Sequence, residues 1–301
     1  MNKKFLISVV GPTAIGKTAT AIQLAQKYNA EIISADSRQF FREMSIGTAK
    51  PTSKELSQAK HHFVDNLSIH DYYSTGDFER EVIDFLDEYF KTNDVAILCG
   101  GSGFYVTAVL DGIDEFPDIS PQIREDVIAL YEKEGIEALQ AILSEKDPEH
   151  YANMDINNKQ RLMRAVEICV GSGLKYSSFL IGKKLKRNFT PIKIGLTLER
   201  EEIYDRINHR VDIMMENGLL EEAKALEQHK NLNALQTVGY QEFFSYLNDE
   251  YDLDRAVELI KRNTRRFAKK QLTWFKKDEE IQWFSPLDPN KIEDFVNDKL
   301  Q

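Results

Sequence analysis

The chain has 301 residues, of which 42% are hydrophobic and 29% are charged, and this composition excludes a disordered or fibrous protein and predicts one large or two modest soluble domains. No apolar run approaches ~20 residues, so we expect no transmembrane helix and no membrane partner. The net charge of −10 argues, taken alone, against a nucleic-acid partner. Cys99 and Cys169 offer neither a disulfide framework nor metal-ligand spacing, which favours the reducing cytoplasm.

The first apolar segment, residues 5–10, predicts a buried strand that runs straight into a glycine loop and is too short for a targeting peptide. The loop fits the pattern G-x-x-x-x-G-K-[ST], and a helical pattern follows it. Its glycines let backbone N–H groups converge on phosphate oxygens, Lys17 supplies a positive charge, and the Thr18 hydroxyl can hold Mg²⁺. The pattern predicts a polyphosphate site, without identifying the phosphate ester, formed by Gly11, Pro12, Thr13, Ala14, Ile15, Gly16, Lys17 and Thr18.

The second apolar segment, residues 31–36, predicts a short strand that leads into Asp36, Ser37, Arg38 and Gln39. Parallel α/β sheets bind their ligands at the carboxyl ends of the strands, so we expect Asp36 to face the phosphate loop. Three roles stay open for its carboxylate: a Mg²⁺ ligand, a general base beside a substrate N–H or O–H, or a cap of the following turn.

The third apolar segment, residues 95–99, predicts a strand that ends in a second glycine-rich turn containing Ser102. A typical phosphate-loop ATPase has a Mg²⁺-binding carboxylate after such a strand, and this chain does not. Three features lie between the second and third predicted strands. Thr48 and Lys50 could reach phosphate, and residues 78–90 predict an amphipathic helix. The adjacent His61 and His62 are interpreted as structural or surface residues, because neighbours in sequence do not face the same way.

Residues 115–190 predict a small helical insertion, because prolines separate short helical patterns there. Residues 157–168 form one such helix with basic side chains, for which a solvated face is the alternative to a binding role. Residues 191–198 predict a return to the sheet. On the helix that follows, Arg206 and Arg210 lie four residues apart and share one face. Arginines clustered on one face near a phosphate loop often close over the phosphates.

The C-terminal part, residues 212–277, predicts further helices. Residues 261–277 carry eight basic residues and no acidic one, and residues 183–187 form a second basic cluster. Such local patches, rather than the net charge, decide where a phosphate backbone docks. Aromatic residues interleaved with these basic residues suit both a core and nucleic-acid contact, and we expect Trp274 in the core.

Seven stretches together resemble the tRNA dimethylallyltransferases: residues 11–18, 33–39, 46–51, 100–103, 160–164, 238–240 and 268–274. The resemblance implies an α/β fold with a P-loop NTPase-like parallel sheet core, residues 1–114 and 190–301, and an inserted all-helical subdomain, residues 115–189, that contacts the anticodon arm of tRNA. It implies transfer of a dimethylallyl group from dimethylallyl diphosphate to N6 of the adenosine 3′-adjacent to the anticodon. No Cys/His zinc-finger tail follows, as in the short bacterial form, and we expect a monomer.

The resemblance also assigns roles to residues. The catalytic residues are Asp36, Ser102 and Lys17. Asp36 takes the proton of adenine N6, and Ser102, which stands where most members have Thr, keeps a hydroxyl near the reacting centre. Lys17 with Mg²⁺ at Thr18 stabilises the diphosphate as the allylic C–O bond breaks. The adenine must leave its stack to meet the allyl group. The residues expected to bind the diphosphate are the loop residues 11–18 with Arg206 and Arg210. Those expected to bind tRNA are Asp36, Ser37, Arg38, Gln39, Ser102, Arg124, Gln160, Arg161, Leu162, Met163, Arg164, Gly239 and Tyr240.

Two departures and three alternatives accompany this assignment. Phe41 replaces a commoner Tyr, and Gln241 stands where Arg is frequent. A small-molecule kinase built on the same loop would transfer phosphate from ATP. An adenylate prenyltransferase would act on free nucleotides and should lack the helical insertion. An RNA-binding module with a degenerate loop is disfavoured by the intact Gly16, Lys17 and Thr18.

Overall fold

The computed structural model describes residues 3–182 and 184–301, so Lys183 of the second basic cluster lies outside the described residues. The chain separates into unit 1, which comprises Met1–Asp111 and Lys186–Gln301, and unit 2, Gly112–Leu185. Unit 2 thus begins and ends a few residues before the insertion expected at 115–189. In the part of the chain that the structure describes, no helix is both long and apolar enough to cross a membrane.

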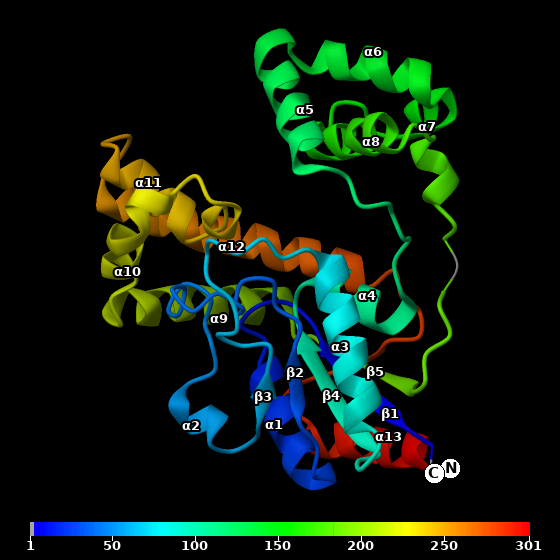
Figure 1. Cartoon of the computed structure of the whole chain (residues 1–301). Coiled ribbons are helices and arrows are strands. Elements are labelled where there is room, and N and C mark those ends of the chain that lie inside the picture. Colours follow the sequence, from blue (N-terminus) through cyan, green and yellow to red (C-terminus); the bar gives the residue numbers. More distant parts are fainter. Residues whose placement is uncertain (1–2, 183) are drawn as a thin grey trace. The chain divides into compact units, whose positions relative to one another are not determined.

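Unit 1 is built on a six-stranded sheet with the strand order β3-β2-β4-β1-β5-β6, in which every pair is parallel (Figure 1). The predicted strands are confirmed, while β3 and β6 are too short to give a sequence pattern. The strands are β1 (Phe5–Val10), β2 (Ile32–Ser34), β3 (His61–His62), β4 (Val95–Gly100), β5 (Thr190–Leu196) and β6 (Gln282–Phe284).

The register of the central strands places three loops at one edge of the sheet. Val10 of β1 pairs with Gly100 of β4, and Ser34 of β2 pairs with Cys99 of β4. The phosphate loop after β1, the Asp36 turn after β2 and the second glycine loop after β4 therefore start side by side, at the carboxyl edge where α/β sheets bind ligands.

Helices cover both faces of this sheet. Successive side chains of a strand point to opposite faces, so alternate residues of β1 pack against different helices. Phe5, Ile7 and Val9 of β1 pack with α1 (Lys17–Tyr28), α9 (Arg200–Glu216) and α13 (Pro289–Leu300). Leu6 and Val10 pack instead with α3 (Thr75–Tyr89) and α4 (Gly103–Asp111). Helix α3 starts earlier than the expected residue 78, because Ser74 and Asp77 form a capping box there.

A further group of helices in unit 1 has its own apolar core around Tyr240 and Phe243. It comprises α10 (Leu219–Leu226), α11 (Tyr240–Leu247) and the first half of α12 (Leu253–Phe275), together with the 3₁₀ turns η2 (Glu227–His229) and η3 (Asn233–Leu235). The short helix α2 (Ser53–Leu56) starts at another capping box, formed by Thr52 and Glu55.

The regular structure of unit 2 is entirely helical in the residues that the structure describes, with a core that includes Leu139, Leu143, Leu162 and Val166. Prolines begin two of its helices and Gly173 ends a third in a left-handed conformation, as expected for helix boundaries. Its elements are α5 (Pro121–Glu134), α6 (Ile136–Lys146), α7 (Pro148–Asn153), α8 (Lys159–Ser172) and the 3₁₀ turn η1 (Tyr176–Phe179).

Candidate active site

The phosphate loop has the backbone that its sequence pattern predicts. Gly11 and Gly16 have φ angles of +147° and +109°, and Gly16 directly precedes the first turn of α1. A Cβ atom at position 11 would lie 2.6 Å from the carbonyl oxygen of Leu196, so the loop can pass β5 this closely only with glycine there. Gly16 thus precedes a helix N-terminus, the kind of helix end whose backbone N–H groups favour anions.

Lys17 is the charged side chain of this loop. Its Nζ donates to the carbonyl oxygen of Pro12 at 2.8 Å, which folds the side chain back over the loop. Burial lowers the pKa of Lys17 to about 8; Cys99 and Asp36 oppose this shift, and Arg210 adds to it. A bound diphosphate would raise the pKa again and keep Lys17 charged, because a nearby anion favours the ammonium form.

The turn after β2, which carries Asp36, is hydrogen-bonded through its neighbour Ser37 to Ser102 of the second glycine loop. Asp36 Oδ1 accepts the backbone N–H of Arg38 at 3.0 Å, which is the turn-capping role and which orients the carboxylate. Ser102 Oγ accepts the N–H of Ser37 at 3.0 Å and lies 3.3 Å from the Ser37 hydroxyl. Two loops from different strands are therefore held together by direct hydrogen bonds.

Arg38 and Gln39 continue the same turn but differ in their surroundings. Burial lowers the pKa of Arg38, and the nearby Tyr105 and Asp36 oppose this shift. The Gln39 side chain is used within the protein: its amide donates to the carbonyl oxygens of Thr48 and Ala49 at 3.2 Å each. Gln39 therefore holds the following loop in place.

The arginines of α9 reach the site to different extents. Arg206 Nη1 lies 3.4 Å from the carbonyl oxygen of Ile15 in the phosphate loop. Burial lowers the pKa of Arg210, which the negative charges of Glu55 and Asp36 oppose. Arg200 instead donates to the Tyr204 hydroxyl at 3.0 Å. Arg206 therefore contacts the phosphate loop, and Arg210 lies close enough to Lys17 to contribute to the lowering of its pKa.

Comparison with known proteins decides the family. The family model for IPP transferases matches residues 39–278. The tRNA dimethylallyltransferase of Flavobacterium johnsoniae is 55% identical over 99% of both chains, and tRNA dimethylallyltransferase 1 of Bacteroides fragilis is 45% identical over 100% of both. The chain belongs to the IPP transferase family. This confirms the resemblance read from the sequence.

Solved structures of IPP transferases agree with this placement. The tRNA isopentenylpyrophosphate transferase of Bacillus halodurans matches with a TM-score of 0.74 and 36% identity, over 99% of this chain and 97% of that one. A eukaryotic dimethylallyltransferase, described as acting on tRNA, matches with a TM-score of 0.84 and 25% identity, over 99% of this chain and 80% of that one. The expected α/β fold with a parallel sheet is confirmed.

Two motifs shared with the family support each other through Glu222, a residue with no signal in the sequence. The Glu222 carboxylate accepts the backbone N–H groups of Ser45, Ile46 and Gly47, each at 2.9 Å, and the hydroxyl of Tyr240 donates to it at 2.6 Å. The Tyr240 side chain is fully buried, and Gly239 beside it is buried as well. Any contribution of Tyr240 to tRNA binding therefore acts through the loop it supports.

Thr48 and Lys50 of the same loop are engaged within the protein. The Thr48 hydroxyl donates to the carbonyl oxygen of Met44 at 2.7 Å. Lys50 Nζ donates to the carbonyl oxygen of Phe41 at 2.6 Å and forms an ion pair with Asp65. The suggestion that these two side chains reach phosphate is corrected: both hold the loop.

The candidate tRNA-binding residues of unit 2 lie on α5 and α8. Arg124, Gln160 and Arg161 are exposed, whereas Leu162 is buried in the core of the unit. The remaining two, Met163 and Arg164, are half-buried, and Arg164 pairs with Glu167 at 2.9 Å and lies 5.6 Å from the ring centroid of Phe116. As with Tyr240, Leu162 can only support its exposed neighbours.

The expected burial of Trp274 is wrong. Its side chain is 40% exposed, packs edge-to-face against Phe104, and donates from Nε1 to the Thr107 hydroxyl at 3.4 Å. The buried stripe of α12 runs through Ala268, Gln271 and Phe275, so Trp274 falls one position outside it. Exposed aromatic and basic residues share this side of the helix: Arg266, Phe267, Lys269, Lys270 and Trp274.

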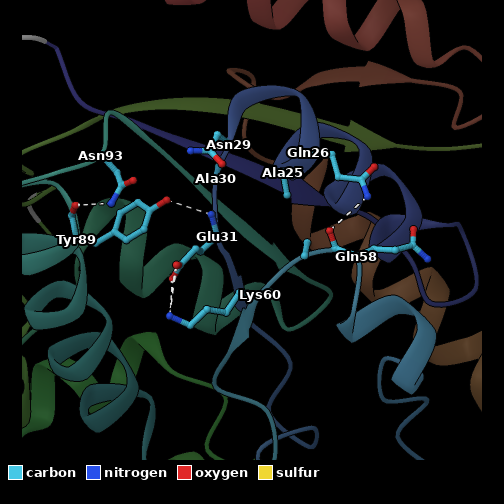
Figure 2. A pocket seen from close by; sticks show the side chains of 10 residues that line it. Ala25, Gln26, Asn29, Ala30, Glu31, Gln58, Lys60, Tyr89 and Asn93 are labelled. Carbon is cyan, nitrogen blue, oxygen red and sulfur yellow. Dashed lines mark hydrogen bonds and ion pairs between the residues drawn. The ribbon is translucent and has the colours of Figure 1, made fainter.

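A surface hollow of about 430 Å³ lies away from this site (Figure 2). Its lining comes from the last part of α1, residues 29–31 just before β2, residues 58–60 just before β3, and the end of α3, whereas the phosphate loop follows the carboxyl end of β1. Figure 2 shows Lys60 paired with Glu31, and the Tyr89 hydroxyl accepting the Glu31 N–H at 3.1 Å. These groups are engaged with each other, and the hollow is not the phosphate site.

Proposed function

We propose that this protein is a tRNA dimethylallyltransferase. It transfers the dimethylallyl group of dimethylallyl diphosphate to N6 of the adenosine 3′-adjacent to the anticodon, in tRNAs that read codons beginning with U, and releases diphosphate and a proton. The observation that carries the proposal is the meeting of a phosphate loop and an acidic turn at one edge of the sheet. Membership of the IPP transferase family supports the same activity.

The phosphate-loop side stabilises the leaving group. Breaking the allylic C–O bond moves negative charge onto the diphosphate, and preorganised positive charge there lowers the barrier. Lys17, the N-terminus of α1 and the arginines Arg206 and Arg210 supply that charge. Mg²⁺ usually binds through substrate phosphates and one or two protein oxygens, and the Thr18 hydroxyl at the start of α1 is the protein oxygen that would hold it here. When bound, it adds positive charge beside the diphosphate.

The acidic turn serves the acceptor. An adenine extruded from the anticodon loop places its N6 beside Asp36, whose carboxylate accepts the proton as N6 forms the new C–N bond. The capping bond from the Arg38 N–H holds this carboxylate in one orientation, and Ser102 fixes the turn from the other side. The proton on Asp36 then passes to solvent.

The polynucleotide is held by surfaces outside the reacting centre. We propose that the exposed side of α12, with Lys269, Lys270 and Trp274, contacts the tRNA backbone and bases. Arg124, Gln160 and Arg161 of unit 2 bind the anticodon arm. The protein acts on tRNA in the cytoplasm, and as a monomer.

A transfer assay with parallel acceptors tests the proposal. Purified protein is incubated with Mg²⁺, radiolabelled dimethylallyl diphosphate and one acceptor: unmodified tRNA with adenosines after the anticodon, AMP or ATP. We expect label in tRNA alone. Label in AMP or ATP would make the protein a free-nucleotide prenyltransferase. No label in any acceptor, with phosphate transfer from ATP to a small molecule, would make it a kinase.

A further inference from the structure

A buried side chain of α12 links the two glycine loops. Gln271 is 6% exposed, and its Oε1 accepts the backbone N–H of Thr13 at 2.9 Å. Its Nε2 donates to the carbonyl oxygen of Gly101, also at 2.9 Å. Thr13 belongs to the phosphate loop and Gly101 to the loop that carries Ser102, so one amide group spans the gap between the two.

The chemistry of this bridge requires both ends of an amide. One loop presents an N–H and the other a carbonyl oxygen, and a neutral primary amide offers an acceptor and a donor in one rigid plane. The fit is close: a Cβ atom at position 101 would lie 2.3 Å from Nε2 of Gln271. Buried backbone groups without a partner are strongly unfavourable, so losing the side chain would force one or both loops to move.

The bridge continues to the turn that holds Asp36. The carbonyl oxygen of Gly101 is bound by Gln271, while the N–H of Ser102, in the same peptide group, lies 3.4 Å from the carbonyl oxygen of Ala35. The Ser102 hydroxyl then accepts the N–H of Ser37. A continuous set of hydrogen bonds therefore runs from the phosphate loop through Gln271 to the acidic turn.

We propose that Gln271 is a positioning residue that sets the separation between the phosphate loop and the Asp36–Ser102 turn. The inference rests on the proposed function, because only a transfer between two bound substrates needs this separation to be fixed. Alignment of two reacting groups contributes steeply to rate, and a displacement of about 1 Å can cost about 100-fold. Helix α12 runs past the carboxyl edge of the sheet (Figure 1) and bears the exposed Lys270 next to Gln271, so it also joins the tRNA surface to the loops.

The substitution Gln271→Glu separates positioning from packing. It keeps the shape and the acceptor toward Thr13, but an ionised carboxylate cannot donate to Gly101. We expect kcat to fall about 10- to 100-fold at a pH of about 8.5, with KM for tRNA changed by less than about twofold. Burial raises the pKa of the introduced carboxyl group, so it becomes protonated as the pH falls. The O–H of the protonated group can then donate to Gly101 in place of the amide N–H. The kcat of Gln271→Glu, divided by the kcat of the wild type at the same pH, should therefore rise at least about threefold between a pH of about 8.5 and a pH of about 6.

Two further variants complete the test. Gln282→Glu adds the same charge at an exposed position of β6 and should leave kcat unchanged at both pH values. Gln271→Met fills the space without either hydrogen bond and should lose kcat at both pH values without recovery, while circular dichroism follows its thermal unfolding. A Gln271→Glu enzyme with wild-type kcat, or with a loss that does not depend on pH, would overturn the inference. A wild-type protein that labels no tRNA would contradict the proposed function, and the inference with it.

Discussion

The two glycine loops at the carboxyl edge of the sheet are held in different ways. The phosphate loop takes most of its shape from its own residues, through the positive φ angles of Gly11 and Gly16 and the bond from Lys17 to Pro12, and Gln271 and Arg206 contact it from outside at Thr13 and Ile15. The second loop is held from outside, by Gln271 of α12 and by Ser37 of the neighbouring turn. The first loop has to bring Lys17 and the backbone N–H groups of a helix start together, which local sequence can encode. The second has to align an acceptor, which requires contacts from distant parts of the chain.

Removing the proposed proton acceptor, the Asp36 carboxylate in the turn bonded to the second glycine loop, should have the largest effect. Asp36→Asn keeps the shape and can still accept the Arg38 N–H, but it cannot take the proton of N6. We expect the single-turnover transfer rate at saturating tRNA to fall about 10²- to 10⁴-fold. Asp298→Asn, at an exposed position of α13, is the matched control and should not change the rate. A full rate for Asp36→Asn would leave only the turn-capping role for this residue.

Removing the charge on the phosphate side should come next. Lys17→Met is expected to lower kcat/KM for dimethylallyl diphosphate about 10²- to 10³-fold, because it removes a preorganised charge from the leaving group. Initial rates at low diphosphate concentration measure it. A reduction in tRNA affinity alone, with unchanged kcat/KM for the diphosphate, would move Lys17 out of the leaving-group site.

The pH dependence of the same parameter sharpens this assignment. Burial lowers the pKa of Lys17 to about 8, so the charged form of the free enzyme is lost as the pH rises through that value. We expect kcat/KM for the diphosphate to decline above a pH of about 8 in the wild type. In Lys17→Arg this decline should be absent, because arginine stays protonated. A decline that persists in Lys17→Arg would assign it to another group.

The Ser102 hydroxyl, which joins the second glycine loop to the Asp36 turn, should matter less. Ser102→Ala leaves the Ser37 N–H without its acceptor, and one such hydrogen bond corresponds to a loss of about tenfold in rate. Ser102→Thr retains the oxygen and should stay close to the wild type. Single-turnover rates of the two variants are compared directly. Equal rates for both would show that the bond to Ser37 does not position the turn.

The smallest effect on chemistry should come from the exposed side of α12. Replacing both Lys269 and Lys270 by Ala is expected to weaken tRNA binding and to lower the slope of log affinity against log salt by up to about 2, while the rate at saturating tRNA is kept. Fluorescence anisotropy at several salt concentrations measures both. Replacing Lys291 and Lys299, exposed on α13, serves as control. An unchanged slope would place α12 away from the RNA.

The same contrast explains what the sequence could predict. The phosphate loop, the Asp36 turn and the central strands were predicted because each is a local pattern of apolar residues, glycines and one helix start. The order of the strands depends on pairing between distant segments, and β3 and β6 are too short for a pattern. Trp274 was misplaced because a shift of one residue around α12 separates the buried stripe from the exposed one.

The supporting residues of the site could not be predicted for a related reason. Gln271 lies in a stretch that resembles the family, yet nothing local to it indicates that its two partners are at positions 13 and 101. Glu222 lies on an ordinary amphipathic helix and gains its role only when residues 45–47 fold against it. Side chains that satisfy distant backbone groups carry no periodicity of their own.

Locating the transferred group in the product tests the central claim most directly. Labelled tRNA from a single turnover is digested to nucleosides and to short oligonucleotides, and mass spectrometry determines which nucleoside and which position carry the added mass. If Lys17 holds the diphosphate while Asp36 accepts the proton of an extruded adenine, the dimethylallyl group will be on N6 of the adenosine 3′-adjacent to the anticodon. Label on another atom or position, or diphosphate released without any transfer, would contradict that account.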